Sequence, residues 1–268
     1  MSVLSDFHVH TTFSGDGEAA AETMIRRAVE LGMEQLCLTD HMDYDYRDGD
    51  VCFEFDPKEY FHHLEQLREK YRGQIDLQIG VELGLRPYLT ARHHSLIFSY
   101  PFDFVIGSVH LVNSRDPYYA SYFENRDEFG AYMEYFECCL HNLEAYSNFD
   151  AFGHLDYVIR YGPNRNRYYS YDLFRGIIDE ILRLLVKKNI ALEVNTTGYR
   201  YGLGEPNPGR DIILRYRELG GKLITIGSDA HREEHLAYKF DEVAKLIKSC
   251  GFSSYYTFHK RVPTEVPL

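Results

Sequence analysis

Residues 223–231 read Leu-Ile-Thr-Ile-Gly-Ser-Asp-Ala-His, a short apolar run followed closely by an aspartate and a histidine. A buried strand that ends at a glycine turn gives this pattern, and it places the two polar side chains just past the carboxyl end of the strand. Similar runs recur along the chain. We expect seven strands, at Val3–Val9, Gln35–Thr39, Asp76–Leu83, Phe104–Val109, Ala151–His154, Ala191–Asn195 and Leu223–Gly227.

Helical patterns separate these strands. Asp56-Pro57-Lys58-Glu59 combines an N-cap aspartate, a first-turn proline and a capping-box glutamate, so it predicts the start of a helix. Another helical apolar repeat runs from Asp172 to Lys188. Strands that alternate with helices are typical of an α/β fold with a parallel sheet or barrel. We expect residues 1–268 to form one domain, with Tyr255–Phe258 as a candidate eighth strand.

The composition is that of an acidic globular protein. The 268 residues include 29 basic and 41 acidic side chains, for a net charge of −12, and 44% are hydrophobic. This excludes a disordered chain, and it argues against general binding to nucleic acid or membrane surfaces, which requires clustered Lys and Arg. The five cysteines lack CxxC spacing, and Met1–Asp6 do not resemble a signal peptide, so we expect a cytoplasmic protein.

Histidines and carboxylates gather at the predicted strand ends. In a parallel barrel, groups at the carboxyl ends of the strands meet on one rim. The histidines in such positions are His8, His10, His41, His110, His154 and His231, and the acids are Asp16, Asp40, Glu82 and Asp229. We interpret the remaining histidines as structural: His62, His63, His93, His94, His141, His235 and His259.

The pair in His8-Val9-His10 projects from one face of a strand, a geometry that suits two ligands of one metal ion. A lone His-x-His is more often a surface or core feature, but its coincidence with the other strand-end groups favours a metal site. Imidazoles and carboxylates without thiolates favour zinc, iron or manganese, and leave open which of them binds. The number of ligands predicts two to three divalent ions, with Glu82 available as a bridge.

Taken together, six motifs resemble the polymerase-and-histidinol-phosphatase (PHP) superfamily of metal-dependent phosphoesterases. They are His8-Val9-His10-Thr11, Thr39-Asp40-His41, Gly80-Val81-Glu82, Gly107-Ser108-Val109-His110, Gly153-His154-Leu155-Asp156 and Gly227-Ser228-Asp229-Ala230-His231. The stretch from Asn195 to Arg200, leading into Gly204-Glu205-Pro206, is similar to the histidinol-phosphate phosphatase branch.

The resemblance implies a distorted (β/α)7-type TIM barrel with a trinuclear metal site at the C-terminal ends of its strands. It implies three ligand sets: His8, His10, Glu82 and Asp229 for the first ion; Glu82, His110 and His154 for the second; Asp16, His41 and His231 for the third. Some relatives have histidine in place of Asp16. We assign catalytic roles to Glu82, Asp229 and His231, and expect Asp40 and Asp156 to orient imidazoles.

The expected activity is hydrolysis of L-histidinol phosphate, a small phosphate monoester, in histidine biosynthesis. Arg160 and Arg200 are positioned to bind its phosphate, because a guanidinium can bind two oxygens at once; the alternative is that they cover apolar surface. The candidates for binding the substrate amine are Asp43, Asp45 and Glu205. The alternative functions are another phosphoesterase of the superfamily, such as a phosphodiesterase, nuclease or protein-tyrosine phosphatase, and a non-catalytic metal-binding module.

Overall fold

The computed structural model describes residues 3–46, 51–164 and 166–268. The expectation that Met1–Asp6 do not form a signal peptide therefore falls partly outside the described residues. In the middle of the molecule lies an eight-stranded parallel sheet, with the order β1-β2-β4-β5-β6-β7-β8 and β3 paired to β4. Its strands are β1 Ser5–Asp6, β2 Gln35–Leu38, β3 His41–Met42, β4 Asp76–Gly84, β5 Phe104–Ser108, β6 Ala151–Phe152, β7 Ala191–Asn195 and β8 Ile224–Gly227.

Backbone hydrogen bonds between the first and last segments of the sheet bend it into a distorted barrel. The Phe7 amide donates to the Ile226 carbonyl at 3.2 Å, and the Asp229 amide donates to the His8 carbonyl at 2.8 Å. Val9 also forms a parallel bridge with Ala230. These contacts confirm the predicted parallel α/β barrel, and they bring the two histidine motifs at opposite ends of the sequence together.

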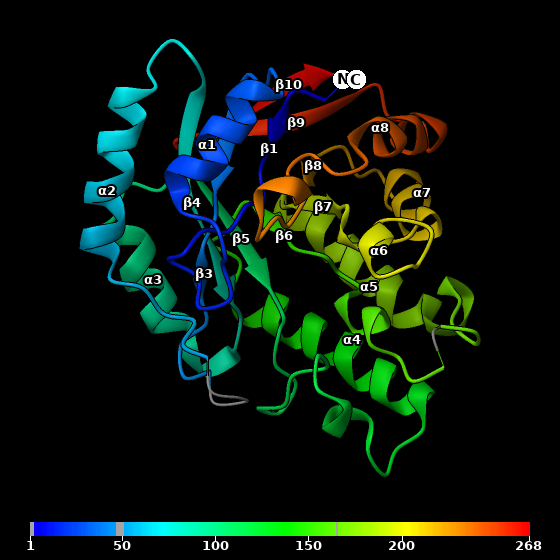
Figure 1. The fold of residues 1–268 in the computed structure, drawn as a ribbon. Coiled ribbons are helices and arrows are strands. Elements are labelled where there is room, and N and C mark those ends of the chain that lie inside the picture. Colours follow the sequence, from blue (N-terminus) through cyan, green and yellow to red (C-terminus); the bar gives the residue numbers. More distant parts are fainter. Residues whose placement is uncertain (1–2, 47–50, 165) are drawn as a thin grey trace.

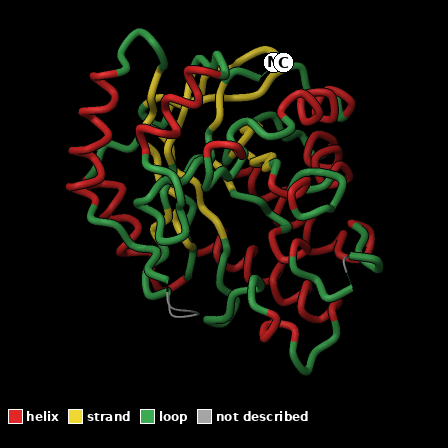
Figure 2. The backbone as a smooth tube through the Cα atoms, in the orientation of Figure 1, coloured by secondary structure: helices red, strands yellow, loops and turns green. Residues whose placement is uncertain are grey.

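Helices surround the strands on the outside of the barrel (Figures 1 and 2). The Asp56 carboxylate accepts from the amides of Lys58 and Glu59, which confirms the predicted N-cap. The α-helices are α1 Ala21–Glu30, α2 Pro57–Lys70, α3 Thr90–Ser99, α4 Glu128–Ala145, α5 Tyr171–Lys188, α6 Thr197–Arg200, α7 Arg210–Glu218 and α8 Phe240–Ser249. Their apolar faces pack against the outer side of the sheet to form the main hydrophobic core.

The candidate eighth strand is present, but it is not part of the barrel. It lies in β9 (Ser254–His259), which pairs antiparallel with β10 (Val262–Pro267) in a separate two-stranded sheet. Phe258 packs against Phe7 and Phe104 inside the barrel, and the Lys260 amide donates to Asp103, which immediately precedes β5. The hairpin therefore covers the amino ends of the strands, opposite the predicted site.

Most predicted strands agree with the structure to within one residue, β3 was not predicted, and two predicted strands are shorter than expected by two residues or more. The first is reduced to Ser5–Asp6, and the fifth to Ala151–Phe152. The polar residues that follow them leave the regular ladder and turn toward the centre of the rim. Among the described residues, no helix is long and apolar enough to cross a membrane.

Candidate metal centre

The nine predicted metal ligands gather at the carboxyl rim of the barrel. Each sits in a strand or in the loop just after one, because the parallel strands all end at this rim. Seven of the nine are buried, His231 is partly exposed, and Asp16 is exposed at the outer edge. Burial of so many ionisable groups in one place costs free energy unless they are paired or bind a metal.

Glu82, two residues before the carboxyl end of β4, lies at the centre of the cluster. Its Oε1 atom lies 3.0 Å from His154 Nε2 and 3.3 Å from both His110 Nε2 and His8 Nε2. Its Oε2 atom lies 2.9 Å from His41 Nδ1, yet it is buried and makes no well-directed hydrogen bond to the described residues. A carboxylate whose two oxygens face different imidazole groups has the geometry of a bridge between two ions.

The two histidines of the first motif face each other across a short gap. His8 Nε2 lies 3.0 Å from His10 Nε2, and the rings are tilted by 50°. His8 Nδ1 lies 2.5 Å from Glu193 Oε1, and this contact fixes the ring so that Nε2 faces His10 and the centre of the cluster. Two ring nitrogens directed at one point suit a shared cation.

A second histidine pair has the same arrangement. His110 Nε2 lies 3.4 Å from His154 Nε2, and both atoms are close to Glu82. His110 Nδ1 lies 2.8 Å from Asp43 Oδ1, which fixes the ring and directs Nε2 inward. Together with Glu82, these two imidazoles make a second group able to hold a metal ion.

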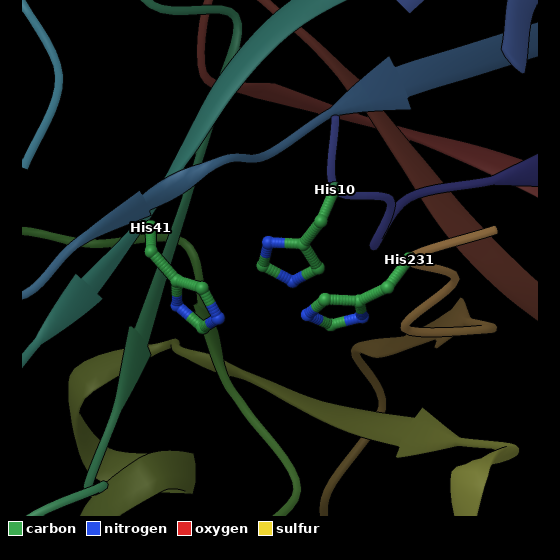
Figure 3. A group of neighbouring side chains, drawn as sticks. All are labelled: His10, His41 and His231. Carbon is green, nitrogen blue, oxygen red and sulfur yellow. The ribbon is translucent and has the colours of Figure 1, made fainter. Parts of the chain in front are cut away.

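A third group forms around His10, His41 and His231, whose rings converge in Figure 3. The His10 ring lies 4.2 Å from each of the other two, measured between centroids. His231 Nε2 is 3.1 Å and His41 Nε2 is 3.8 Å from the Asp16 carboxylate. The structure therefore brings together Asp16, His41 and His231, the third predicted ligand set. His10, which belongs to the first predicted set, lies next to them.

The protonation states of the cluster are mixed. Burial lowers the pKa of every histidine in it, but nearby carboxylates outweigh burial and raise the pKa of His8, His41, His110 and His231, so a metal ion would have to displace a proton from these rings. Burial, together with the nearby rings of His231 and His41, holds the pKa of His10 well below its usual value, so its imidazole is neutral. Burial alone would raise the pKa of Glu82, but the surrounding histidines, with His8 foremost, hold it well below its usual range. Neutral imidazoles and ionised carboxylates are the forms that bind divalent ions.

The groups that orient the imidazoles differ from those expected. Asp40 accepts hydrogen bonds from Thr11 and Ser14, and Ser14 Oγ lies 3.0 Å from His10 Nδ1, so Asp40 acts on an imidazole through a serine. The prediction that Asp156 orients an imidazole is wrong. Its carboxylate accepts from Asn207 and from the Gly209 amide instead.

Sequence reasoning missed Glu193. It lies in the middle of β7, is 1% exposed, and contacts His8 through one oxygen and the His154 amide through the other. A charged residue inside an otherwise apolar strand is rare unless it has a partner, and that signal was available in Ala191–Asn195. Asp43, considered for the substrate amine, instead contacts the imidazoles of His110 and His41.

We expect Glu193→Gln to weaken metal retention by roughly 10–100-fold, because partners that orient a ligating histidine typically contribute that much to affinity. The measurement is metal content after dialysis against graded chelator concentrations. Glu65→Gln, on the exposed face of α2, removes the same charge away from the site and serves as the control. Equal metal retention by both variants would show that Glu193 does not support the centre.

The two predicted phosphate-binding arginines both line the cavity above the rim. Arg160 donates to Asp229 Oδ2 at 3.2 Å, and its second terminal nitrogen is buried without a hydrogen-bond partner among the described residues. Arg200 donates to the carbonyls of Ser228 and Asp229. It thereby supports a turn in which Asp229 has the left-handed φ of 53°.

A cavity of about 690 Å³ opens over the cluster. Away from the metal ligands its wall combines charged side chains with several aromatic rings, and the tyrosines in it include Tyr46, Tyr118, Tyr157, Tyr161 and Tyr201. Asp116 in the same wall accepts hydrogen bonds from the hydroxyls of Tyr46 and Tyr157. Of the carboxylates considered for the substrate amine, Asp43 lines the cavity, whereas Asp45 pairs with Arg92 and Glu205 accepts from the Arg210 amide.

Comparison with known proteins places this geometry in a family. Residues 6–197 match the PHP domain. The chain belongs to the PHP family. Its PHP relatives include a histidinol-phosphatase of Lactococcus lactis subsp. lactis (strain IL1403), 33% identical over 94% of this chain and 93% of that protein. A probable histidinol-phosphatase of Thermotoga maritima is 34% identical, with 93% of each chain covered.

Solved structures extend the comparison. The crystal structure of the Lactococcus lactis histidinol phosphate phosphatase, in complex with zinc, L-histidinol and phosphate, has a TM-score of 0.90 and 32% identity, and the match covers 97% of this PHP chain and 98% of that chain. A putative histidinol phosphatase from Listeria monocytogenes shares the fold, with a TM-score of 0.78 and 21% identity.

Proposed function

We propose that this protein is a metal-dependent phosphatase that hydrolyses L-histidinol phosphate to L-histidinol and phosphate, a step of histidine biosynthesis. The observation that carries the proposal is the buried set of imidazoles and carboxylates beside a cavity that is also lined by Arg160, one of whose buried donors has no hydrogen-bond partner in the described part of the chain. The relative with a TM-score of 0.90, crystallised with zinc, histidinol and phosphate, supports the choice of substrate.

The donor set fits two to three divalent ions, and zinc, iron and manganese are the metals that suit it. Two observations support the fit: pairs of imidazole nitrogens face each other, and Glu82 Oε2 is buried without a hydrogen bond to the described residues. The proposed ligands are His8, His10, Glu82 and Asp229 for one ion, Glu82, His110 and His154 for a second, and Asp16, His41 and His231 for a third.

Phosphate monoesters resist hydrolysis because their negative charge repels an attacking anion. Divalent ions, when bound, lower the pKa of water and neutralise phosphate oxygens. Arg160 would bind a nonbridging phosphate oxygen through its unpaired donor, while its contact with Asp229 keeps the guanidinium next to the cluster. The proposed roles of Glu82, Asp229 and His231 are to fix the spacing and charge of the centre around the phosphoryl group.

The aromatic wall would receive the leaving group. An imidazole ring stacks well on tyrosine, and a cationic imidazolium or ammonium is further attracted by the ring faces. The buried Asp116 carboxylate holds Tyr46 and Tyr157 by their hydroxyls, which sets the shape of this wall and adds negative charge behind it. A small cationic alcohol such as histidinol fits this environment better than a nucleic acid does.

Phosphate release from histidinol phosphate and from p-nitrophenyl phosphate, with and without chelator, tests the proposed function. We expect kcat/KM to be far higher for histidinol phosphate, and activity to disappear with chelator and return with added metal. Equal rates on the two esters would favour a broader phosphoesterase, and a test against a phosphodiester and a phosphotyrosine peptide would identify it. No hydrolysis of any ester after metal is restored would favour a non-catalytic metal-binding module.

For Arg160→Ala and Arg200→Ala, we expect a fall in kcat/KM of about one to two orders of magnitude each, because a charge-assisted hydrogen bond to phosphate contributes roughly 1.5–3 kcal/mol. Lysine should recover part of this loss, since it keeps the charge but not the planar fork. Steady-state kinetics with metal content checked on each variant measures both effects. Arg215→Lys, on α7 in an ion pair with Asp179, is the control. Unchanged kcat/KM for Arg200→Ala would leave Arg200 as a support for the Asp229 turn.

A further inference from the structure

A chain of hydrogen bonds leads from Asp156 to the guanidinium of Arg160. Asp156 Oδ1 accepts from Asn207 Nδ2 at 2.7 Å, and Asn207 Oδ1 accepts from Arg160 Nε at 2.8 Å. On the other side of the guanidinium, one terminal nitrogen donates to Asp229 Oδ2. The remaining terminal nitrogen is the buried donor that has no partner among the described residues. Arg160 is thus held at two edges and keeps one donor for a ligand in the cavity.

Asn207 is itself fixed in place. It is fully buried, and its backbone amide and carbonyl both pair with those of Asn195 at 2.8 Å. The orientation of its side-chain amide is determined by Arg160, because a guanidinium offers only donors and must meet the Oδ1 atom, which leaves the Nδ2 group to donate to Asp156. The Gly209 amide holds the second oxygen of Asp156 at 3.2 Å, so both carboxylate oxygens are occupied.

We propose that Asn207, supported by Asp156, is a positioning residue that holds Arg160 in the orientation that binds the phosphoryl group. The proposal rests on the proposed function, in which Arg160 contacts phosphate. A free arginine side chain samples many rotamers, and ordering it on binding costs free energy that a preformed orientation avoids. The Nε contact with Asn207 fixes the plane of the guanidinium, and this plane decides where its unpaired donor points.

Asn207→Ala should therefore weaken the binding of phosphate, although the substitution removes no group that contacts the phosphate. We expect kcat/KM for the phosphate ester to fall by roughly 10–100-fold, the range for losing a hydrogen bond to a charged group. The affinity for inorganic phosphate, measured by titration calorimetry, should fall in parallel. Metal content should stay that of the wild type, because the variant leaves every proposed ligand in place.

A double-mutant cycle with Arg160→Ala separates positioning from a general structural role. If Asn207 acts through Arg160, Asn207→Ala should change kcat/KM by less than about twofold when Arg160 is already alanine, because coupled residues are not additive. The same loss in both backgrounds would overturn the proposal. Asn142→Ala is the control, since Asn142 is a buried asparagine whose amide donates to the Cys138 carbonyl in α4. It should lower thermal stability and leave phosphate affinity unchanged.

Asp156→Asn provides a second route if Asn207→Ala does not fold. It keeps the size of the side chain but replaces one of the two acceptor oxygens with an amide donor, so we expect a smaller loss of phosphate affinity that also vanishes in the Arg160→Ala background. If Arg160→Ala weakens phosphate binding while the Asn207 and Asp156 variants do not, the positioning role is wrong and the proposed function stands. If Arg160→Ala has no effect on phosphate, the phosphate-binding role of Arg160 is wrong, and the positioning role with it.

Discussion

Glu82→Gln is expected to abolish most turnover while the protein remains folded. Among the residues that the structure describes, Glu82 is the one carboxylate within 3.5 Å of His8, His110 and His154 together. Its amide variant therefore leaves several imidazoles and any bound ions without their shared negative charge. Even the partners that only orient metal ligands contribute roughly 10–100-fold, so loss of a ligand shared by two ions should lower kcat/KM by at least roughly a hundredfold. Turnover, metal content and thermal unfolding should be measured on the same samples.

Asp103→Asn is the matched control for this experiment. Asp103 is also a buried carboxylate, but it lies at the amino end of β5 and pairs with Arg68 at the opposite end of the barrel. Its loss should lower the melting temperature and leave metal content and kcat at wild-type values. A Glu82→Gln variant that turns over normally would show that Glu82 is not the bridging ligand.

Asp229→Asn is expected to have the second-largest effect. The Asp229 carboxylate lies 3.4 Å from His10 Nε2 and 3.8 Å from His8 Nε2, and it also accepts from Arg160. The substitution therefore removes a proposed metal ligand and also the anion that holds the phosphate-binding arginine. We expect kcat/KM to fall by roughly a hundredfold or more, with a rise in KM from the loosened arginine.

The comparison of Asp229→Asn with Arg160→Ala separates these two contributions. Arg160→Ala should keep its metal, whereas Asp229→Asn should lose part of it on dialysis. If Asp229→Asn keeps both its metal and its kcat, the assignment of Asp229 to the first ligand set is wrong.

Much of the fold could be read from the sequence because the strands and the polar residues that follow them are local signals. The run from Leu223 to His231 predicts both a buried strand and two rim groups, and both are present at the rim. The ends of the short strands could not be read in this way. After Asp6 the chain leaves the regular ladder, and His8 and His10 reach the centre of the rim. The tertiary contacts of these histidines determine where the strand ends, and local strand propensity does not.

The partners of the site residues were harder to predict than the residues themselves. Glu193 and Asp43 meet their histidines across different strands, so no spacing in the sequence reports the contact. Asp156 was expected to orient an imidazole, but its carboxylate accepts from Asn207 instead. Such pairings depend on register and loop path, which one sequence does not contain.

The most direct measurement of the central claim is elemental analysis of the protein purified without chelator, combined with assays on the same preparation. The buried cluster offers more imidazole and carboxylate ligands than one ion needs, so we expect two to three equivalents of zinc, iron or manganese per chain. Phosphate release from histidinol phosphate should fall as these ions are removed and recover as they are restored. Full activity with one equivalent or fewer would contradict the multinuclear centre.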